Sequence, residues 1–190
     1  MTTNYRDTLN LPETQFSMKA GLPQKEPEIL NFWHQNDIYK KIREKYSDSE
    51  LFLLHDGPPY ANGAIHLGHS VNKILKDITI KYKTLKGFNA PFIPGWDCHG
   101  LPIELNVEKK HGKNSELVQD KESFQKACKE YAETQINNQM DDFKRLGVFG
   151  DWENSYKSLD SSFEAEIIRS LGTIYDCLLY TSPSPRDKRL

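Results

Sequence analysis

Apolar residues recur at three- and four-residue steps in several stretches of the chain. The clearest stretch runs from Leu67 to Gly87, and its spacing predicts an amphipathic helix that ends at the glycine. Its apolar positions are Val71, Ile74, Leu75, Ile78, Tyr82 and Leu85. The intervening lysines are predicted to form the solvated face of this helix, with an RNA contact as the alternative. They are Lys73, Lys76, Lys81, Lys83 and Lys86.

Three further helices are predicted from the same periodicity. Residues 26–42 carry Leu30, Trp33, Ile38 and Ile42 on one face, with Pro27 suited to the first helical position. A long helix is predicted over 122–147, where Gly147 would end it. Another is predicted from Ser161, in which Glu164 stands at the right distance for a capping box.

Two short apolar segments read as strands on either side of the Leu67–Gly87 helix. Residues 51–56, "LFLLHD", have the length and composition of a buried parallel strand. Residues 88–100, "FNAPFIPGWDCHG", are too rich in proline for a helix and predict a second strand with its exit loop. Strand, helix and strand make a parallel βαβ unit, which places the loops after the two strands at one sheet edge.

Composition excludes several classes of protein. The 190 residues are 27% charged with a net charge of -2, and no run reaches the length of a membrane span. A free-standing nucleic-acid binder would show a basic excess. The N-terminus lacks the pattern of an export signal, so a cytoplasmic location is expected. Three scattered cysteines, Cys98, Cys128 and Cys177, predict reduced thiols rather than disulfides or a zinc site.

The loop "HDGPPYANGAIHLGH", residues 55–69, joins the first strand to the helix. A helix N-terminus attracts anions, and Gly63 and Gly68 would let the backbone approach one closely. His66 and His69 would share one face of the first turn and donate hydrogen bonds to phosphate. For either histidine alone, a capping or surface role is the alternative. A metal site shared with the segment 97–99 is a third interpretation.

Asp97 follows the second strand. Its carboxylate could hold the ammonium group of an amino-acid substrate, or it could cap the next helix. The neighbouring Trp96 could belong to the core or to a ligand wall.

Three ordered blocks of sequence resemble the class I aminoacyl-tRNA synthetases, most closely the isoleucine-specific ones. They are "DGPPYANGAIHLGH", which contains the His-x-Gly-His signature, "PGWDCHGLPIELNVEKKHG" and "FKRLGVFGDWENSY". The resemblance covers residues 4–176. Leu67 replaces the isoleucine that is commoner in the signature, a near-isosteric change.

The resemblance implies a fold, a reaction and roles for individual residues. The fold would be α/β: the first half of a Rossmann-like catalytic domain, with added helices and an N-terminal helical arm. The reaction would form isoleucyl-adenylate from isoleucine and ATP with Mg²⁺, then transfer the isoleucyl group to tRNA(Ile). His66 and His69 would be catalytic, and Gly57, Pro58 and Asp97 would bind the amino acid. The ATP-binding residues would be Pro59, Tyr60, Ala61, Asn62, Gly63, His66, Gly68 and His69.

Family members are several times longer than this chain. They add an editing domain, a lysine-rich second signature, an anticodon-binding domain and a zinc-binding end, so zinc is expected only outside this sequence. We therefore expect an N-terminal fragment, a monomer that is poorly stable and inactive alone. Its expected parts are an arm and helix (1–50), part of the catalytic domain (51–176) and a non-native or disordered tail (177–190).

Other interpretations are a valyl- or leucyl-specific synthetase, a small nucleotide-binding or nucleotidyltransferase module with the same loop, or a non-catalytic tRNA or protein binder. The first of these usually carries a different sequence at positions 60–63, which favours isoleucine here.

Overall fold

The computed structural model describes residues 8–10 and 19–177, in two compact units, Met1–Asn36 and Asp37–Leu190. The tail predicted to be non-native or disordered lies, from residue 178 on, outside the described residues. In the first unit, helix α1 spans Leu22–Gln35. It begins earlier than predicted, with Pro23 in its first turn, so that Pro27 lies inside the helix instead of starting it. The left-handed Gly21 makes this start possible, because its carbonyl accepts the backbone N–H groups of residues 24 and 25.

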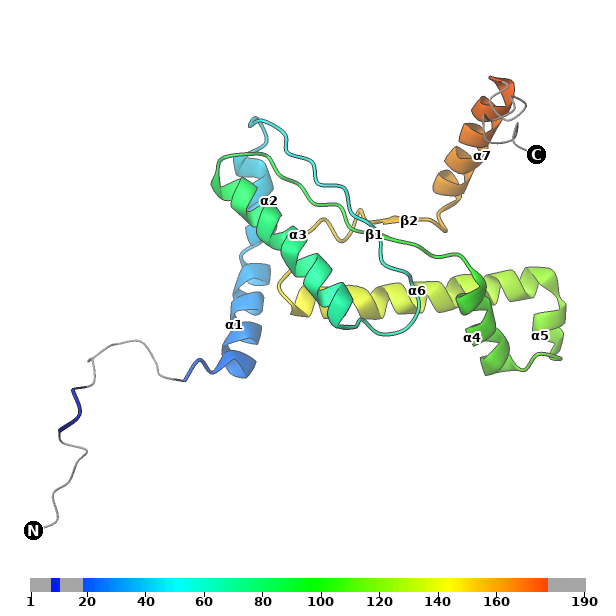
Figure 1. Cartoon of the computed structure of the whole chain (residues 1–190), viewed down its shortest axis with the longest axis horizontal. Coiled ribbons are helices and arrows are strands. Elements are labelled where there is room, and N and C mark those ends of the chain that lie inside the picture. Colours follow the sequence, from blue (N-terminus) through cyan, green and yellow to red (C-terminus); the bar gives the residue numbers. More distant parts are fainter. Residues whose placement is uncertain (1–7, 11–18, 178–190) are drawn as a thin grey trace, which may run out of the picture. The chain divides into compact units, whose positions relative to one another are not determined.

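The second unit contains six helices and two short strands among the described residues (Figure 1). In chain order they are α2 (Ile38–Lys45), α3 (Leu67–Leu85), β1 (Gly95–Trp96), α4 (Leu101–His111), α5 (Glu116–Gln119), α6 (Lys121–Arg145), β2 (Tyr156–Lys157) and α7 (Ser161–Asp176). The prediction of one helix over 26–42 is wrong, because the helical conformation is interrupted between α1 and α2 at Asp37, whose backbone is left-handed at φ 49°. The stops predicted at Gly87 and Gly147 are confirmed, since both follow a helix end with positive φ.

The parallel βαβ arrangement is present, but its strands are shorter than predicted. β1 pairs in parallel with β2, while the first segment meets the second only at two isolated parallel bridges, Leu51 with Asn89 and Tyr60 with Asp97. Between the two bridges lie four prolines, Pro58 and Pro59 in residues 51–60 and Pro91 and Pro94 in residues 89–97; they have no N–H to donate, so a continuous ladder cannot form. The prediction of a buried strand over 51–56 is also wrong, because Leu51 and Leu53 are exposed.

The face of α3 that packs against the protein is the opposite of the one predicted. Lys73, Asp77 and Ile80 are buried, whereas the six apolar positions predicted to pack inward are exposed, with Ile78 56% and Leu85 84% accessible. Three of the five lysines pair with buried carboxylates, Lys73 and Lys76 with Asp56 and Lys81 with Asp77, whereas Lys86 is exposed as predicted. Within the described residues, nothing covers the apolar face of α3. Periodicity located the helix correctly, but it misassigned the face that packs inward.

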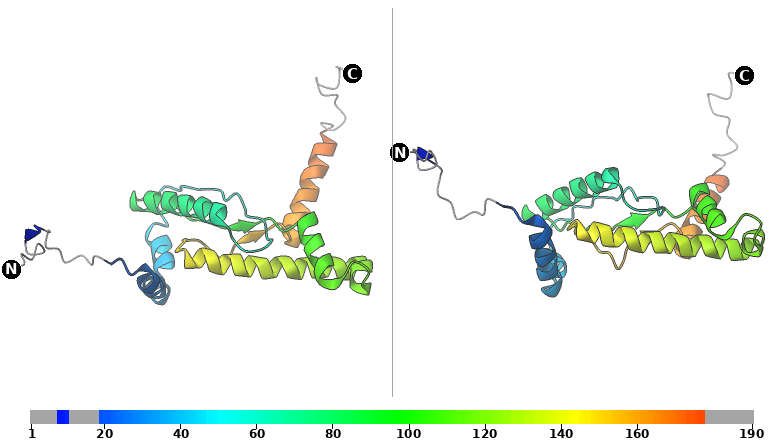
Figure 2. Two further views of the ribbon diagram at one scale, coloured as in Figure 1. Left: turned by 60° about the horizontal axis from the view of Figure 1, so that its bottom comes forward. Right: turned by 90° about the horizontal axis from the view of Figure 1, so that it is seen from below.

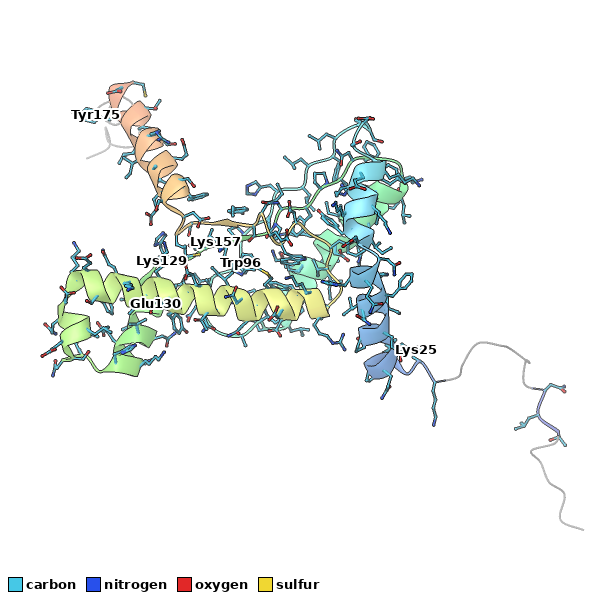
Figure 3. The ribbon with its side chains drawn as sticks, turned by 180° about the vertical axis from the view of Figure 1, so that it is seen from behind. Lys25, Trp96, Lys129, Glu130, Lys157 and Tyr175 are labelled. Carbon is cyan, nitrogen blue, oxygen red and sulfur yellow. The ribbon has the colours of Figure 1, made fainter. Side chains whose placement is uncertain are left out.

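The core lies between α3 and α6, where the small sheet and the extended segments run (Figure 2). One cluster of buried side chains centres on Trp96, Phe143 and Ile136, and a second on Phe92 and Ile80. Trp96 lies against α6 (Figure 3), and its Nε1 donates a 3.0 Å hydrogen bond to Gln139 Oε1. Trp96 is therefore a core residue.

Helix α7 begins at Ser161 as predicted, but without the capping box. Its N-cap residue is Asp160, and no side chain caps the helix. Glu164 lies instead with one carboxylate oxygen 3.4 Å from His99 Nε2, which removes it from the position that a capping box needs. None of the residues of α7 is buried. Over the described residues, no helix combines the length and apolar character needed to cross a bilayer.

Candidate functional site

A cavity of about 360 Å³ opens at the N-terminus of α3. It gathers seven of the residues singled out in the sequence: Gly57, Pro58, Pro59, Tyr60, His66, Gly68 and His69. Asn72, Lys73 and Phe143 complete its lining. The residues expected to bind the amino acid at 57 and 58 therefore share one cavity with the histidines expected to bind phosphate.

The two histidines of the loop cap α3 reciprocally. His66 is the N-cap residue, and its Nδ1 accepts a 3.1 Å hydrogen bond from the backbone N–H of Gly68. His69 Nδ1 accepts from the backbone N–H of His66 at 3.3 Å, and the two rings stack with centroids 3.8 Å apart. The capping alternative is thus realised in the structure, and it constrains the chemistry of both rings. A neutral imidazole whose Nδ1 accepts must carry its proton on Nε2, so each ring keeps an Nε2–H donor.

Gly68 is required by this ring arrangement. A Cβ at that position would lie 2.9 Å from His66 Cε1 and 3.0 Å from its Nδ1. Since carbon atoms in proteins do not approach so closely, any larger residue would push the His66 ring off the helix N-terminus. The glycine of the His-x-Gly-His motif therefore has a steric reason in this chain.

The environment favours the neutral form of His69. Burial lowers the pKa of His69 below its ordinary value of 6.5, and the charges of His66 and Lys73 lower it further. A neutral His69 at the positive end of the helix can donate its Nε2–H to an anion. The cavity therefore presents donors suited to phosphate oxygens.

The three loop residues 61–63 lie outside the lining of this cavity. Ala61 is fully buried in the core. Asn62 Oδ1 accepts hydrogen bonds from Asn106 Nδ2 at 2.8 Å and from the Tyr131 hydroxyl at 2.9 Å. The carbonyl of Gly63 accepts from Gln139 at 2.9 Å. Their polar groups thus attach the loop to α4 and α6, which is a structural role that the expectation of ATP contact did not foresee.

Gln139 is a site-supporting residue that the sequence analysis missed. It is fully buried on α6, and its Nε2 donates to the carbonyls of Tyr60 and Gly63 at 3.0 and 2.9 Å. Its Oε1 accepts from Trp96, so one side chain joins the loop, β1 and α6. The sequence signal was a glutamine on the side of a helix that is otherwise apolar, beside Ile136 and Phe143.

Asp97 lies beside the loop in the backbone but does not line the cavity. Its N–H donates to the carbonyl of Pro59 at 2.9 Å, and its carbonyl accepts from the N–H of Ala61 at 2.7 Å. The Asp97 side chain is exposed. The helix-capping alternative for this residue is wrong, because Gly100 is the N-cap residue of α4.

The metal interpretation of the histidine loop finds no support. Cys98 and His99 line a second cavity of about 520 Å³, bounded by α4, α6 and the start of α7, and not the cavity of His66 and His69. Across the described ranges, no three His, Cys, Asp or Glu side chains gather in a way that could hold a metal ion.

Below the loop, Asp56 forms a buried charged cluster. Its Oδ2 accepts from the buried Lys73 Nζ and, at 3.2 Å, from the backbone N–H of Gly95. Its Oδ1 accepts from Lys76 Nζ at 2.6 Å. Burial lowers the pKa of Lys73, although the charge of Asp56 acts in the opposite direction. Sequence reasoning placed both lysines in solvent, because each pairs with a residue in another segment, 17 positions away for Lys73 and 20 for Lys76.

Comparison with known families gives one clear match. Residues 28–183 match the model of the family described as tRNA synthetases class I (I, L, M and V). This range includes the whole histidine loop and all of the described second unit from its first residue onward.

Individual relatives agree with the family match. The chain is 59% identical, over 174 residues, to isoleucine-tRNA ligases of Francisella philomiragia subsp. philomiragia and Francisella tularensis subsp. mediasiatica. The alignment covers 92% of this chain and 18% of each relative, so the chain spans about a fifth of their length. Among solved structures, the ternary complex of Agrobacterium radiobacter K84 agnB2 LeuRS with tRNA and LeuAMS superposes with a TM-score of 0.63. Its sequence is 19% identical, and the match covers 83% of this chain and 18% of that one. This likeness establishes the fold.

Proposed function

The chain belongs to the class I tRNA synthetase family, and from this premise we propose that it is the N-terminal part of an isoleucine-tRNA ligase. In the complete protein it would activate isoleucine with ATP to isoleucyl-adenylate and then transfer the isoleucyl group to tRNA(Ile). Mg²⁺ would accompany ATP. The observation that carries the proposal is that the cavity unites His66 and His69 with Gly57 and Pro58 in a chain 59% identical to isoleucine-tRNA ligases.

The geometry around α3 supports an electrostatic role for the two histidines. Activation joins a carboxylate oxygen of isoleucine to the α-phosphorus of ATP and releases pyrophosphate. Negative charge develops on the phosphoryl oxygens as the new bond forms. Donors already held in place at such a site are worth about 2.7 to 4 kcal/mol each. We assign this role to the Nε2–H groups of His66 and His69, which the reciprocal caps hold in place.

The amino acid would occupy the side of the cavity formed by Gly57 and Pro58. Its ammonium group would pair with Asp97, whose side chain is exposed beside the loop. Among the described residues, no group of three His, Cys, Asp or Glu side chains could hold the Mg²⁺ ion. The ATP phosphates would carry the ion themselves.

Pyrophosphate exchange tests the proposal. The unaltered chain would replace the matching segment of the Francisella philomiragia relative, and ATP-pyrophosphate exchange would be measured with isoleucine, valine and leucine. We expect exchange to depend on isoleucine and to fall about 100-fold or more when either histidine is replaced by alanine. Exchange that is equally strong with leucine, or that survives loss of both histidines, would contradict the assignment.

A matched pair of glycine variants isolates the capping geometry. Gly68→Ala should lower exchange, because the new Cβ would displace the His66 ring. Gly172→Ala lies on α7 with no atom within 4 Å of the new Cβ, and it should leave exchange unchanged. For the 190-residue chain alone we expect no exchange.

A further inference from the structure

We propose that Asp56 and Lys73 act as a positioning pair, which fixes the amino-acid side of the cavity relative to the phosphate side. The proposal rests on the function proposed above and assigns a role there to Asp56, which does not line the cavity, and to Lys73, which is part of the lining but is paired with Asp56.

Asp56 connects its own loop, which lines the cavity, with α3, β1 and β2. Its carboxylate accepts from Lys73 and Lys76 on α3 and from the N–H of Gly95 on β1. Its backbone carbonyl accepts a 2.9 Å hydrogen bond from the hydroxyl of Tyr156 on β2. Because the prolines prevent a backbone ladder here, the Asp56 carboxylate supplies hydrogen bonds between segments that main-chain groups would supply in a regular parallel sheet.

Both charged side chains of the pair are almost completely buried. Asp56 is 1% exposed and Lys73 2% exposed. The Lys73 Nζ also lies 5.4 Å from the ring centroid of Phe92 and 5.3 Å from that of Phe143. Two aromatic rings and a carboxylate therefore surround the ammonium group. A pair so enclosed cannot reorient without moving the segments it joins.

Both halves of the proposed reaction are attached to this pair. Asp56 directly precedes Gly57 and Pro58, which line the amino-acid side. Lys73 lies one helical turn after His69, which lines the phosphate side. The ion pair therefore sets the separation between the place proposed for the isoleucine carboxylate and the place proposed for the α-phosphate.

A positioning role predicts a specific kinetic signature. Reactant alignment affects the rate of bond formation, and a misplacement of about 1 Å can cost about 100-fold. Isoleucine and ATP would still bind, because their own contacts remain. Variants of the pair should thus lower kcat for adenylate formation about 100-fold and leave both KM values near those of the unaltered protein.

The experiment measures kcat and KM by pyrophosphate exchange in the chimaera, the protein in which this chain replaces the matching segment of the Francisella philomiragia relative. Asp56→Asn removes the charge at constant shape, and Asp56→Glu keeps the charge but lengthens the tether. Because Asp56→Asn leaves a buried ammonium group without its partner and destabilises the protein for that reason alone, the double variant Asp56→Asn/Lys73→Met removes both charges together. All three variants should show the fall in kcat at nearly constant KM.

The matched control lies on the same helix. Asp77 pairs with Lys81, and its Oδ1 accepts from the N–H of Phe149 at 2.8 Å. Asp77→Asn therefore disturbs a second inward-facing carboxylate that does not line the cavity, and it should leave kcat near that of the unaltered chimaera. A double variant that folds and keeps its kcat would overturn the proposal. So would a loss confined to KM, or Asp56→Glu with undiminished kcat, which would indicate a purely electrostatic effect.

A second readout separates this proposal from the proposed function. In the 190-residue chain, Asp56→Asn should shift the amide resonance of His69 and Lys73→Met should shift that of Gly57, each across the ion pair, whereas Asp77→Asn should shift neither. If the unaltered chimaera shows no isoleucine-dependent exchange, the proposed function fails. The amide shifts then still decide whether the pair couples the two sides of the cavity, and unchanged resonances would refute it.

Discussion

Replacement of Gly95 by alanine tests how the short sheet is held together at the site. Gly95 and Tyr156 are partners in the register of β1 and β2. The Tyr156 ring lies directly over the glycine, so that an added Cβ would stand 2.0 Å from Cζ and 2.3 and 2.4 Å from the two Cε atoms. Ordinary contact begins at 3.4 Å. The ring would therefore have to retreat by about 1.4 Å, which is more than a packed interior accommodates without loss.

The expected cost has two parts. Overpacking of this kind costs about 1 to 3 kcal/mol. The displaced ring would also lose the 2.9 Å hydrogen bond from the Tyr156 hydroxyl to the carbonyl of Asp56, which contributes about 1 kcal/mol. Gly95→Ala should thus lower the free energy of unfolding by about 2 to 4 kcal/mol.

Urea unfolding, followed by tryptophan fluorescence, measures this loss, since the buried Trp96 is the next residue in the chain. Gly172→Ala serves as the control and should be neutral or stabilising by up to about 1 kcal/mol, because an open helix position favours alanine. A double-mutant cycle with Tyr156→Ala removes the clash and should recover about 1 to 3 kcal/mol as coupling. Coupling close to zero, or a Gly95→Ala variant as stable as the control, would refute the reasoning.

Three further predictions concern the histidine pair, the loop anchor and the inverted helix. His69 should titrate below its ordinary pKa of 6.5; the folded chain then binds fewer protons than the unfolded chain between the two pKa values, so stability rises with pH through that interval. NMR titration of the imidazole checks this, and a midpoint at or above 6.5 would contradict it. Gln139→Leu should cost at least about 2 kcal/mol in urea unfolding, since it leaves Trp96 Nε1 and two loop carbonyls without their partner. Ile80→Ala should cost about 2 to 5 kcal/mol and Ile78→Ala less than about 1, because the first is 2% and the second 56% exposed; equal losses would show that the exposure pattern of α3 is wrong.

The sequence predicted where α3 and α6 lie, because helix periodicity and glycine stops are local signals. It did not predict which face of α3 packs inward. Amphipathicity assigns apolar residues to the interior by default, yet here the interior partner is the carboxylate of Asp56 and the matching residue is Lys73. Pairing between residues in different segments has no periodic signature, so only the fold could reveal it.

The sequence predicted only some of the residues of the candidate site. Gly57, Pro58, His66 and His69 were expected to act together, and one cavity does bring them together. Gln139 was missed, because it acts through hydrogen bonds to a loop far away in sequence.

By itself, the sequence determined the positions of α3, α6 and α7 and pointed to the family. Helix positions, glycine stops and the order of the signature blocks are written in short-range patterns, and the family match extends over 28–183. The tertiary structure decided which groups from distant segments meet. Asp56 accepts a hydrogen bond from Gly95 where prolines interrupt the sheet, Lys73 pairs with Asp56 in the interior, and the His66 ring packs against Gly68. These arrangements arise where desolvation and hydrogen bonding between distant segments outweigh the local preference of each one.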